Sequence, residues 1–74
     1  MFENSEVAME VLNVFLTINE RMNESIIATQ DRISPEECKV FKRAVAHVMY
    51  EVFEKVVEPI CNRHPSLKPP GFDD

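Results

Sequence analysis

The stretch that decides the fold is ISPEEC, residues 33–38, near the middle of a chain of 74 residues. Ser34 can accept a hydrogen bond from a free backbone N–H, Pro35 fits the first position of a helix, and Glu37 can complete a capping box. Glu36 and Glu37 also suit the positive end of a helix dipole. The stretch therefore predicts a helix start, and it divides the chain into two helical segments.

The segment before this start, about residues 5–30, has the periodicity of an amphipathic helix. Its apolar residues recur at steps of three and four and are Ala8, Val11, Leu12, Phe15, Ile18, Met22 and Ile26. Polar residues fall on the opposite side and are Glu6, Glu10, Asn13, Thr17, Glu20 and Glu24. The pattern predicts a first helix with one apolar side and one largely acidic side.

The segment after the start, about residues 35–62, shows the same periodicity more strongly. Its apolar positions are Cys38, Phe41, Val45, Val48, Met49, Val52, Val56 and Ile60. Pro59 lies late in this segment, where a proline removes one backbone donor and clashes with the preceding turn. We therefore predict a second helix with a kink or an end near residues 57–59.

The two predicted helices are similar in length and joined by a short connector. We therefore expect an all-α protein whose residues 1–62 form an antiparallel two-helix hairpin. Near the connector, this pairing brings acidic residues of the first helix beside basic residues of the second, namely Glu20, Glu24, Lys39, Lys42 and Arg43. Exposed ion pairs contribute roughly 0–1 kcal/mol each, so they select the pairing more than they stabilise it.

Both apolar faces are too wide for a single partner helix. When the remaining apolar residues are counted, each face spans about 200° at 100° per residue. A lone hairpin would leave an apolar patch in water of the size that marks an interface. We therefore expect a homodimer in which two hairpins form a four-helix bundle. The candidate dimer-core residues are Phe15, Ile18, Met22, Phe41, Val45, Val48, Val52 and Val56.

Residues 63–74 form a proline-containing tail, for which we expect extended or polyproline geometry. Its large apolar side chains are Leu67 and Phe72. They either belong to a frayed terminus or dock across the bundle or onto a partner. Within the two predicted helices, Tyr50 is the one aromatic residue that the expected core does not use. The candidate partner contacts are therefore Tyr50, Leu67 and Phe72.

Composition sets the broad class of the protein. Hydrophobic residues make up 45% and charged residues 28%, which is typical of a globular domain. The formal charge is −5, and residues 1–30 carry five glutamates against Arg21 alone. This acidic balance argues against direct contact with nucleic acid or with an anionic membrane. Neither a signal peptide nor a membrane span is visible, so we expect a cytoplasmic protein.

The residues that could carry chemistry do not assemble into a catalytic or cofactor site. Cys38 and Cys61 lie 23 positions apart on one predicted helix, about 34 Å, which is too far for a disulfide within the chain. We expect reduced thiols, although a crossed disulfide between two subunits remains open. Cys61 and His64 form a C-x-x-H pair that could supply half of a zinc site, but one pair is a weak signal. No cofactor and no metal are predicted.

Asn19 and Asn23 project toward the apolar side of the first helix. Two interpretations remain open for them. They either edge the apolar face, or a buried asparagine fixes the register or the number of partners at a cost in stability.

We expect a small non-enzymatic helical protein that acts through protein–protein interaction, as an adaptor or regulator. The alternative is an acidic decoy that occupies the nucleic-acid site of another protein. In that role, acidic side chains of the first segment would imitate phosphates, and they are Glu3, Glu6, Glu10, Glu20 and Glu24.

Overall fold

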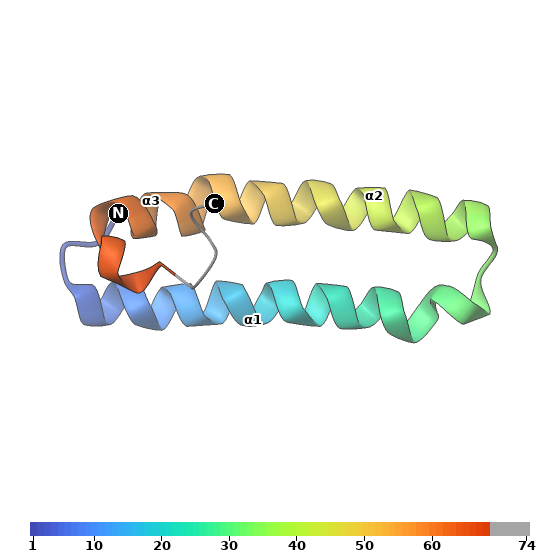
Figure 1. Cartoon of the computed structure of the whole chain (residues 1–74), viewed down its shortest axis with the longest axis horizontal. Helices are drawn as coiled ribbons and strands as arrows, with labels where there is room; N and C mark the ends of the chain where they lie inside the picture. The colour runs from blue at the N-terminus through green and yellow to red at the C-terminus, as the bar shows by residue number, and fades with distance from the viewer. Residues whose placement is uncertain (69–74) are drawn as a thin grey trace.

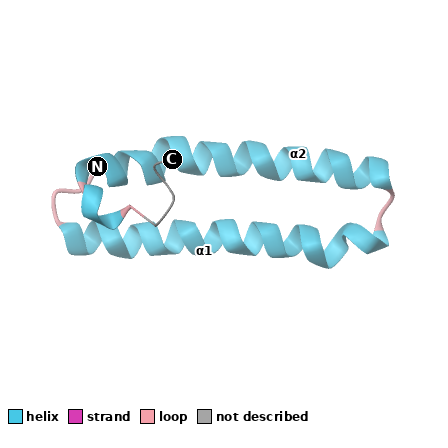
Figure 2. Cartoon of the chain, in the orientation of Figure 1, coloured by secondary structure: helices cyan, strands magenta, loops and turns pink. Residues whose placement is uncertain are grey.

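The computed structural model describes residues 1–68 of the chain. Its helices are α1 (Ser5–Thr29), the 3₁₀ turn η1 (Gln30–Arg32), α2 (Pro35–Val52), the π-helical turn η2 (Phe53–Val57), α3 (Glu58–Arg63) and the 3₁₀ turn η3 (Pro65–Leu67). The helix α1 runs antiparallel to the continuous run of α2, η2 and α3 (Figure 1). Within residues 1–68, helix covers nearly the whole chain, and loops form the residues before α1 and the short joints between helices (Figure 2). The predicted all-α antiparallel hairpin is confirmed.

Side-chain caps begin both long helices. Asn4 Oδ1 accepts hydrogen bonds from the backbone N–H groups of Glu6 and Val7, at 2.8 and 3.2 Å. Ser34 Oγ accepts from the N–H of Glu37 at 3.1 Å, and Pro35 occupies the first helical turn. Within residues 1–68, the carboxylate of Glu37 makes no return bond to Ser34. The predicted helix start at residues 34–35 is confirmed, with one half of the capping box formed.

The second helix neither ends nor breaks before Pro59. It continues through the π-helical turn η2, in which the N–H of Glu58 donates to the carbonyl of Phe53, five residues earlier. Pro59 lacks an N–H, and its ring crowds the carbonyl four residues before it. A π turn placed just before the proline widens the backbone there and lets the helix continue. Of the two outcomes expected near residues 57–59, an end does not occur, and the helix changes there through a π turn.

The hairpin is held by a seam whose residues on α1 alternate at steps of four and three, the spacing of antiparallel coiled coils. The seam residues on α1 are Ala8, Leu12, Phe15, Asn19, Met22, Ile26 and Thr29. Those on α2 and η2 are Cys38, Phe41, Val45, Met49, Val52 and Val56. All of them are buried or half-buried. The seam therefore uses much of the apolar surface that the sequence pattern revealed.

The tightest packing lies at one end of the hairpin, which we call the α3 end. The buried cluster there consists of Ala8, Leu12, Val57, Ile60 and Cys61, each 3% exposed or less. Leu67 packs against this cluster because Pro65–Leu67 forms a 3₁₀ turn and not the extended chain that we expected. His64 Nε2 also donates to the carbonyl of Phe2 at 2.8 Å, which fixes the start of the chain beside α3.

Candidate interaction face

A row of aliphatic side chains lies on α1 directly beside the seam. Val7, Val14 and Ile18 are 40%, 54% and 39% exposed, and Val11 between them is half-buried. Their steps of four, three and four place them in one line along the helix. Each of them immediately precedes a seam residue. The seam therefore leaves this second apolar line of α1 uncovered.

A matching row lies on α2. Val40 and Val48 are 71% and 51% exposed, and Ala44 between them is exposed as well. These three residues also immediately precede seam residues. The helix α2 runs in the direction opposite to α1, and its seam faces the seam of α1. In such a pair, the residues that immediately precede seam residues lie on the same broad side of the hairpin in both helices. We call this side the valine face, and it comprises Val7, Val11, Val14, Ile18, Val40, Ala44 and Val48.

The valine face is hollowed near the connector. A hollow of about 560 Å³ is lined by Ser34, Glu36, Glu37, Val40, Phe41 and Ala44. A second hollow, of about 450 Å³, lies around the connector itself and is lined by Gln30, Asp31, Ile33, Pro35, Cys38, Lys39 and Lys42. The first hollow is suited to an apolar side chain, whereas two lysines and an aspartate line the second hollow.

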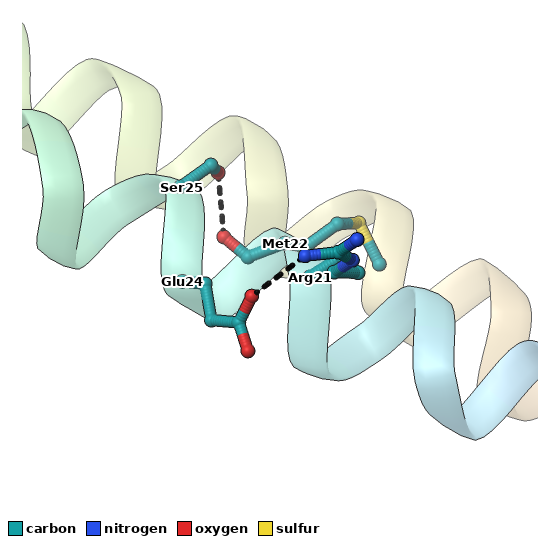
Figure 3. Close-up of polar contacts among 4 residues, drawn as sticks. All are labelled: Arg21, Met22, Glu24 and Ser25. Atoms are coloured by element: carbon teal, nitrogen blue, oxygen red, sulfur yellow. Dashed lines mark hydrogen bonds and ion pairs between the residues drawn. The ribbon is translucent and has the colours of Figure 1, made fainter.

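Charged side chains on the valine face are balanced. Positions that precede the seam also include Arg21 and Lys55, and against them Glu37 and Glu51. Lys55 Nζ lies 3.7 Å from Glu51 Oε2, and Arg21 Nη1 lies 3.4 Å from Glu24 Oε1 (Figure 3). Figure 3 also shows Ser25 Oγ donating to the carbonyl of Met22, at 2.6 Å.

Both ion pairs of the described part of the chain lie within a single helix. The expected cross-helix contacts of Glu20 and Glu24 with the lysines of α2 are thus not formed. The pairing of the helices is set by the seam.

The candidate dimer-core residues divide into two groups. Most lie on the seam of one chain, namely Phe15, Met22, Phe41, Val45, Val52 and Val56. Ile18 and Val48 lie on the valine face. The sequence reasoning left Val7, Val14, Val40 and Ala44 out of that set. Their steps of three and four carried the signal that could have found them.

The candidate partner contacts have different surroundings. Tyr50 is 62% exposed, and a hydrogen bond from its hydroxyl to Glu54, together with the charge of that carboxylate, raises the pKa of Tyr50 above its usual value. Leu67 packs against the buried cluster of its own chain. Phe72 lies outside the described residues.

The residues singled out for chemistry are dispersed. Cys38 and Cys61 are both free thiols, and burial raises the pKa of Cys61, an effect that nearby Lys68 partly offsets. His64, the other half of the C-x-x-H pair, bonds the Phe2 carbonyl. Residues 1–68 hold no group of three His, Cys, Asp or Glu side chains placed to bind a metal ion.

The two asparagines of α1 differ. The Oδ1 atom of Asn19 is buried in the seam and accepts no hydrogen bond from any described residue. Asn23 is exposed. Asn23 therefore edges the face, whereas Asn19 is a buried polar group of the kind that costs stability.

None of the helices formed by residues 1–68 combines the length and the apolarity that crossing a bilayer requires. The chain matches no protein-family model, no curated protein and no solved structure. The valine face, with its hollow and its balanced charges, is therefore the candidate functional site on physical grounds alone.

Proposed function

We propose that this protein acts without catalysis, by self-associating into a four-helix bundle and presenting its outer surfaces to a protein partner as an adaptor or regulator. The observation that carries the proposal is the valine face, on which large aliphatic side chains are 39–71% exposed. Burying a valine or isoleucine completely stabilises an association by about 1.5–3 kcal/mol, so a row of them favours contact with protein over water.

The surfaces left free in such a bundle include the outer side of α1 and the neighbourhood of Tyr50. Exposed tyrosines are frequent anchors at protein interfaces. Acidic residues of the outer side of α1 are exposed, namely Glu6, Glu10, Glu20 and Glu24. These surfaces suit a partner that carries basic and aromatic side chains.

The test is the solution mass of the full chain by light scattering at low micromolar concentration. A dimer of about 17 kDa, twice the chain mass of 8.6 kDa, supports self-association. A compact monomer contradicts it, because the valine face would then remain in water or belong to another protein.

The acidic decoy is the second candidate function. Its support is the exposed row of glutamates on α1, which only Arg21 offsets within that helix. A decoy would bind a nucleic-acid-binding protein by long-range electrostatics, and about 0.3 M salt would screen most of that attraction. Binding to a basic partner that survives such salt would exclude the decoy and favour apolar docking.

A further inference from the structure

We infer that the valine face is the surface on which a second copy of this chain docks. The inference rests on the self-association proposed above and names the face that is used. The hairpin has two broad sides and two narrow outer sides, and each of them offers a different contact. The valine face is the one whose chemistry and size fit its own copy.

Exposed apolar side chains are distributed unequally between the two broad sides of the hairpin. Five large ones lie on the valine face, namely Val7, Val14, Ile18, Val40 and Val48. On the other broad side, residues that immediately follow the seam include three, namely Met9, Ile27 and Tyr50. The valine face is also the more regular of the two, because its five large exposed side chains are all β-branched and form one row on α1 and one on α2. Such rows pack well against equivalent rows of another helix pair.

The area of a broad side also matches the area that stable interfaces bury. The molecule measures 45 × 19 × 17 Å, so a broad side offers about 850 Å². Stable interfaces bury about 800 Å² on each partner. One copy of the hairpin therefore covers the face completely, and the hollow lined by Val40, Phe41 and Ala44 provides a seat for an aliphatic side chain from the facing copy.

The charges of the valine face are also compatible with a second copy of the same face. The valine face carries Arg21 and Lys55 against Glu37 and Glu51, with Glu36 in the lining of its hollow, so two copies of it bring little excess charge together. The outer side of α1 carries four exposed glutamates, and two copies of that surface would repel each other. Among the surfaces of this acidic chain, the valine face is thus suited to its own copy.

The experiment compares glutamate substitutions on the two broad sides in the full chain. Val40→Glu on the valine face is matched with Ile27→Glu on the other side, because the two wild-type residues are 71% and 66% exposed. Val14→Glu is matched with Met9→Glu, at 54% and 46%. Each change adds one negative charge, and glutamate is at least as good a helix former as the residues it replaces. Dimer dissociation is measured by sedimentation or light scattering, and folding by circular dichroism.

We expect the dissociation constant of the dimer to rise at least 100-fold for Val40→Glu and Val14→Glu, and less than threefold for Ile27→Glu and Met9→Glu. If the wild-type chain is dimeric but the two variants on the other side are the ones that dissociate, the assignment of the face is wrong while self-association stands. The assignment is also overturned if all four variants remain dimers. A monomeric wild-type chain overturns both proposals and leaves the face to a different protein.

A second set of variants covers the case in which a glutamate variant does not fold. Val40→Thr and Val14→Thr keep the β-branched shape, and the hydroxyl stays in water in the monomer. Dissociation should still increase by about tenfold for each, because the hydroxyl loses water in the dimer. An unchanged dissociation constant for both threonine variants contradicts the inference.

Discussion

The two ends of the hairpin have almost the same length of paired helix but very different interiors. At the α3 end, α1, α3 and η3 meet, and five of the six buried hydrophobic residues of the described chain lie there. Toward the connector only two helices meet, and Val45 is the single buried residue, 7% exposed. Two helices alone thus leave most of their seam half-buried, whereas a third segment closes it at the α3 end.

The third segment is short, but two long-range contacts hold it. Leu67 packs on the cluster of Ala8, Ile60 and their neighbours, and His64 bonds the carbonyl of Phe2. Phe2 has a positive φ of 61°, a conformation that costs a non-glycine residue about 1–2 kcal/mol. The contacts at this end therefore offset a local strain, whereas the connector end is held by the Ser34 cap and a mostly half-buried seam.

We expect the largest loss of stability from truncating a buried side chain at the α3 end. Ile60 is fully buried, so Ile60→Ala should lower the free energy of unfolding by about 2–5 kcal/mol through lost burial and a cavity. Ile27→Ala is the matched control, because Ile27 is 66% exposed and should cost less than about 0.5 kcal/mol. Urea unfolding of both variants at one protein concentration checks the difference, and equal losses would contradict a core at the α3 end.

Replacing the orphaned polar group of the seam should stabilise the open half of the hairpin. Asn19→Leu removes a buried acceptor without a partner and should raise the free energy of unfolding by about 1–3 kcal/mol. Asn23→Leu, at an exposed position, should change it little. Thermal unfolding gives the stabilities. If Asn19→Leu gains nothing, Asn19 Oδ1 is paired in solution.

Asn19→Leu also tests whether Asn19 determines the register or the number of partners. If Asn19 fixes the register or the number of partners, the leucine variant gains stability but populates additional oligomers. A gain in stability with unchanged mass would show that Asn19 does not specify the assembly.

The two cysteines report the two ends separately. Cys61 is 2% exposed and its thiol has a raised pKa, whereas Cys38 is half-buried near the connector. Alkylation at pH 8 should therefore modify Cys38 about tenfold faster than Cys61, because thiolate and access are both needed. Mass spectrometry of peptides resolves the two rates. Equal rates in the folded protein would mean that the α3 end opens as readily as the connector end.

The raised pKa of Cys61 also predicts a pH dependence. The unfolded thiol ionises before the folded one, so the contribution of Cys61 to stability is complete below the ordinary pKa of a thiol and is lost as the pH rises beyond it. Tyr50, whose pKa is raised as well, acts in the same direction, and Tyr50→Phe removes its share. Stability that increases above pH 9 in Tyr50→Phe would contradict the burial of Cys61.

The smallest effect on stability is expected from the hydrogen bond that joins His64 to the start of the chain. His64→Ala removes the bond to the Phe2 carbonyl and should cost about 0.5–1.5 kcal/mol. His47→Ala is the control, because His47 is exposed on α2. Amide hydrogen exchange should increase for residues near the start of α1 only in the first variant. No change there would show that other contacts hold the start of the chain.

Local sequence signals were sufficient for the hairpin. Ser34 and Pro35 marked the second helix, and apolar steps of three and four marked the sides of both helices that contain the seam. Such steps group residues within a wide arc, so they could not separate Val48 on the valine face from Met49 on the seam, although the two point about 100° apart. That separation requires knowing where the second helix lies.

Features that depend on contacts between distant residues were not predictable. The turn at Pro65–Leu67 forms where Leu67 packs on an apolar cluster to which Ala8 and Leu12, near the other end of the chain, contribute. The passage of the helix through Pro59 likewise depends on a π turn, and the sequence indicated only that something must change there. The unequal burial of the two ends follows from both features.

The π turn at Phe53–Val57 also changes the phase of the helical rod. An added residue in one turn rotates everything after it by about 100° relative to an uninterrupted α-helix. This rotation brings Val57 and Cys61 toward Ala8, although neither continues the heptad that leads through Val45 and Val52. One continuous rod thus carries two heptad frames, and deleting a single residue within the π turn would merge them into one α-helical frame while leaving Cys61 directed at the core.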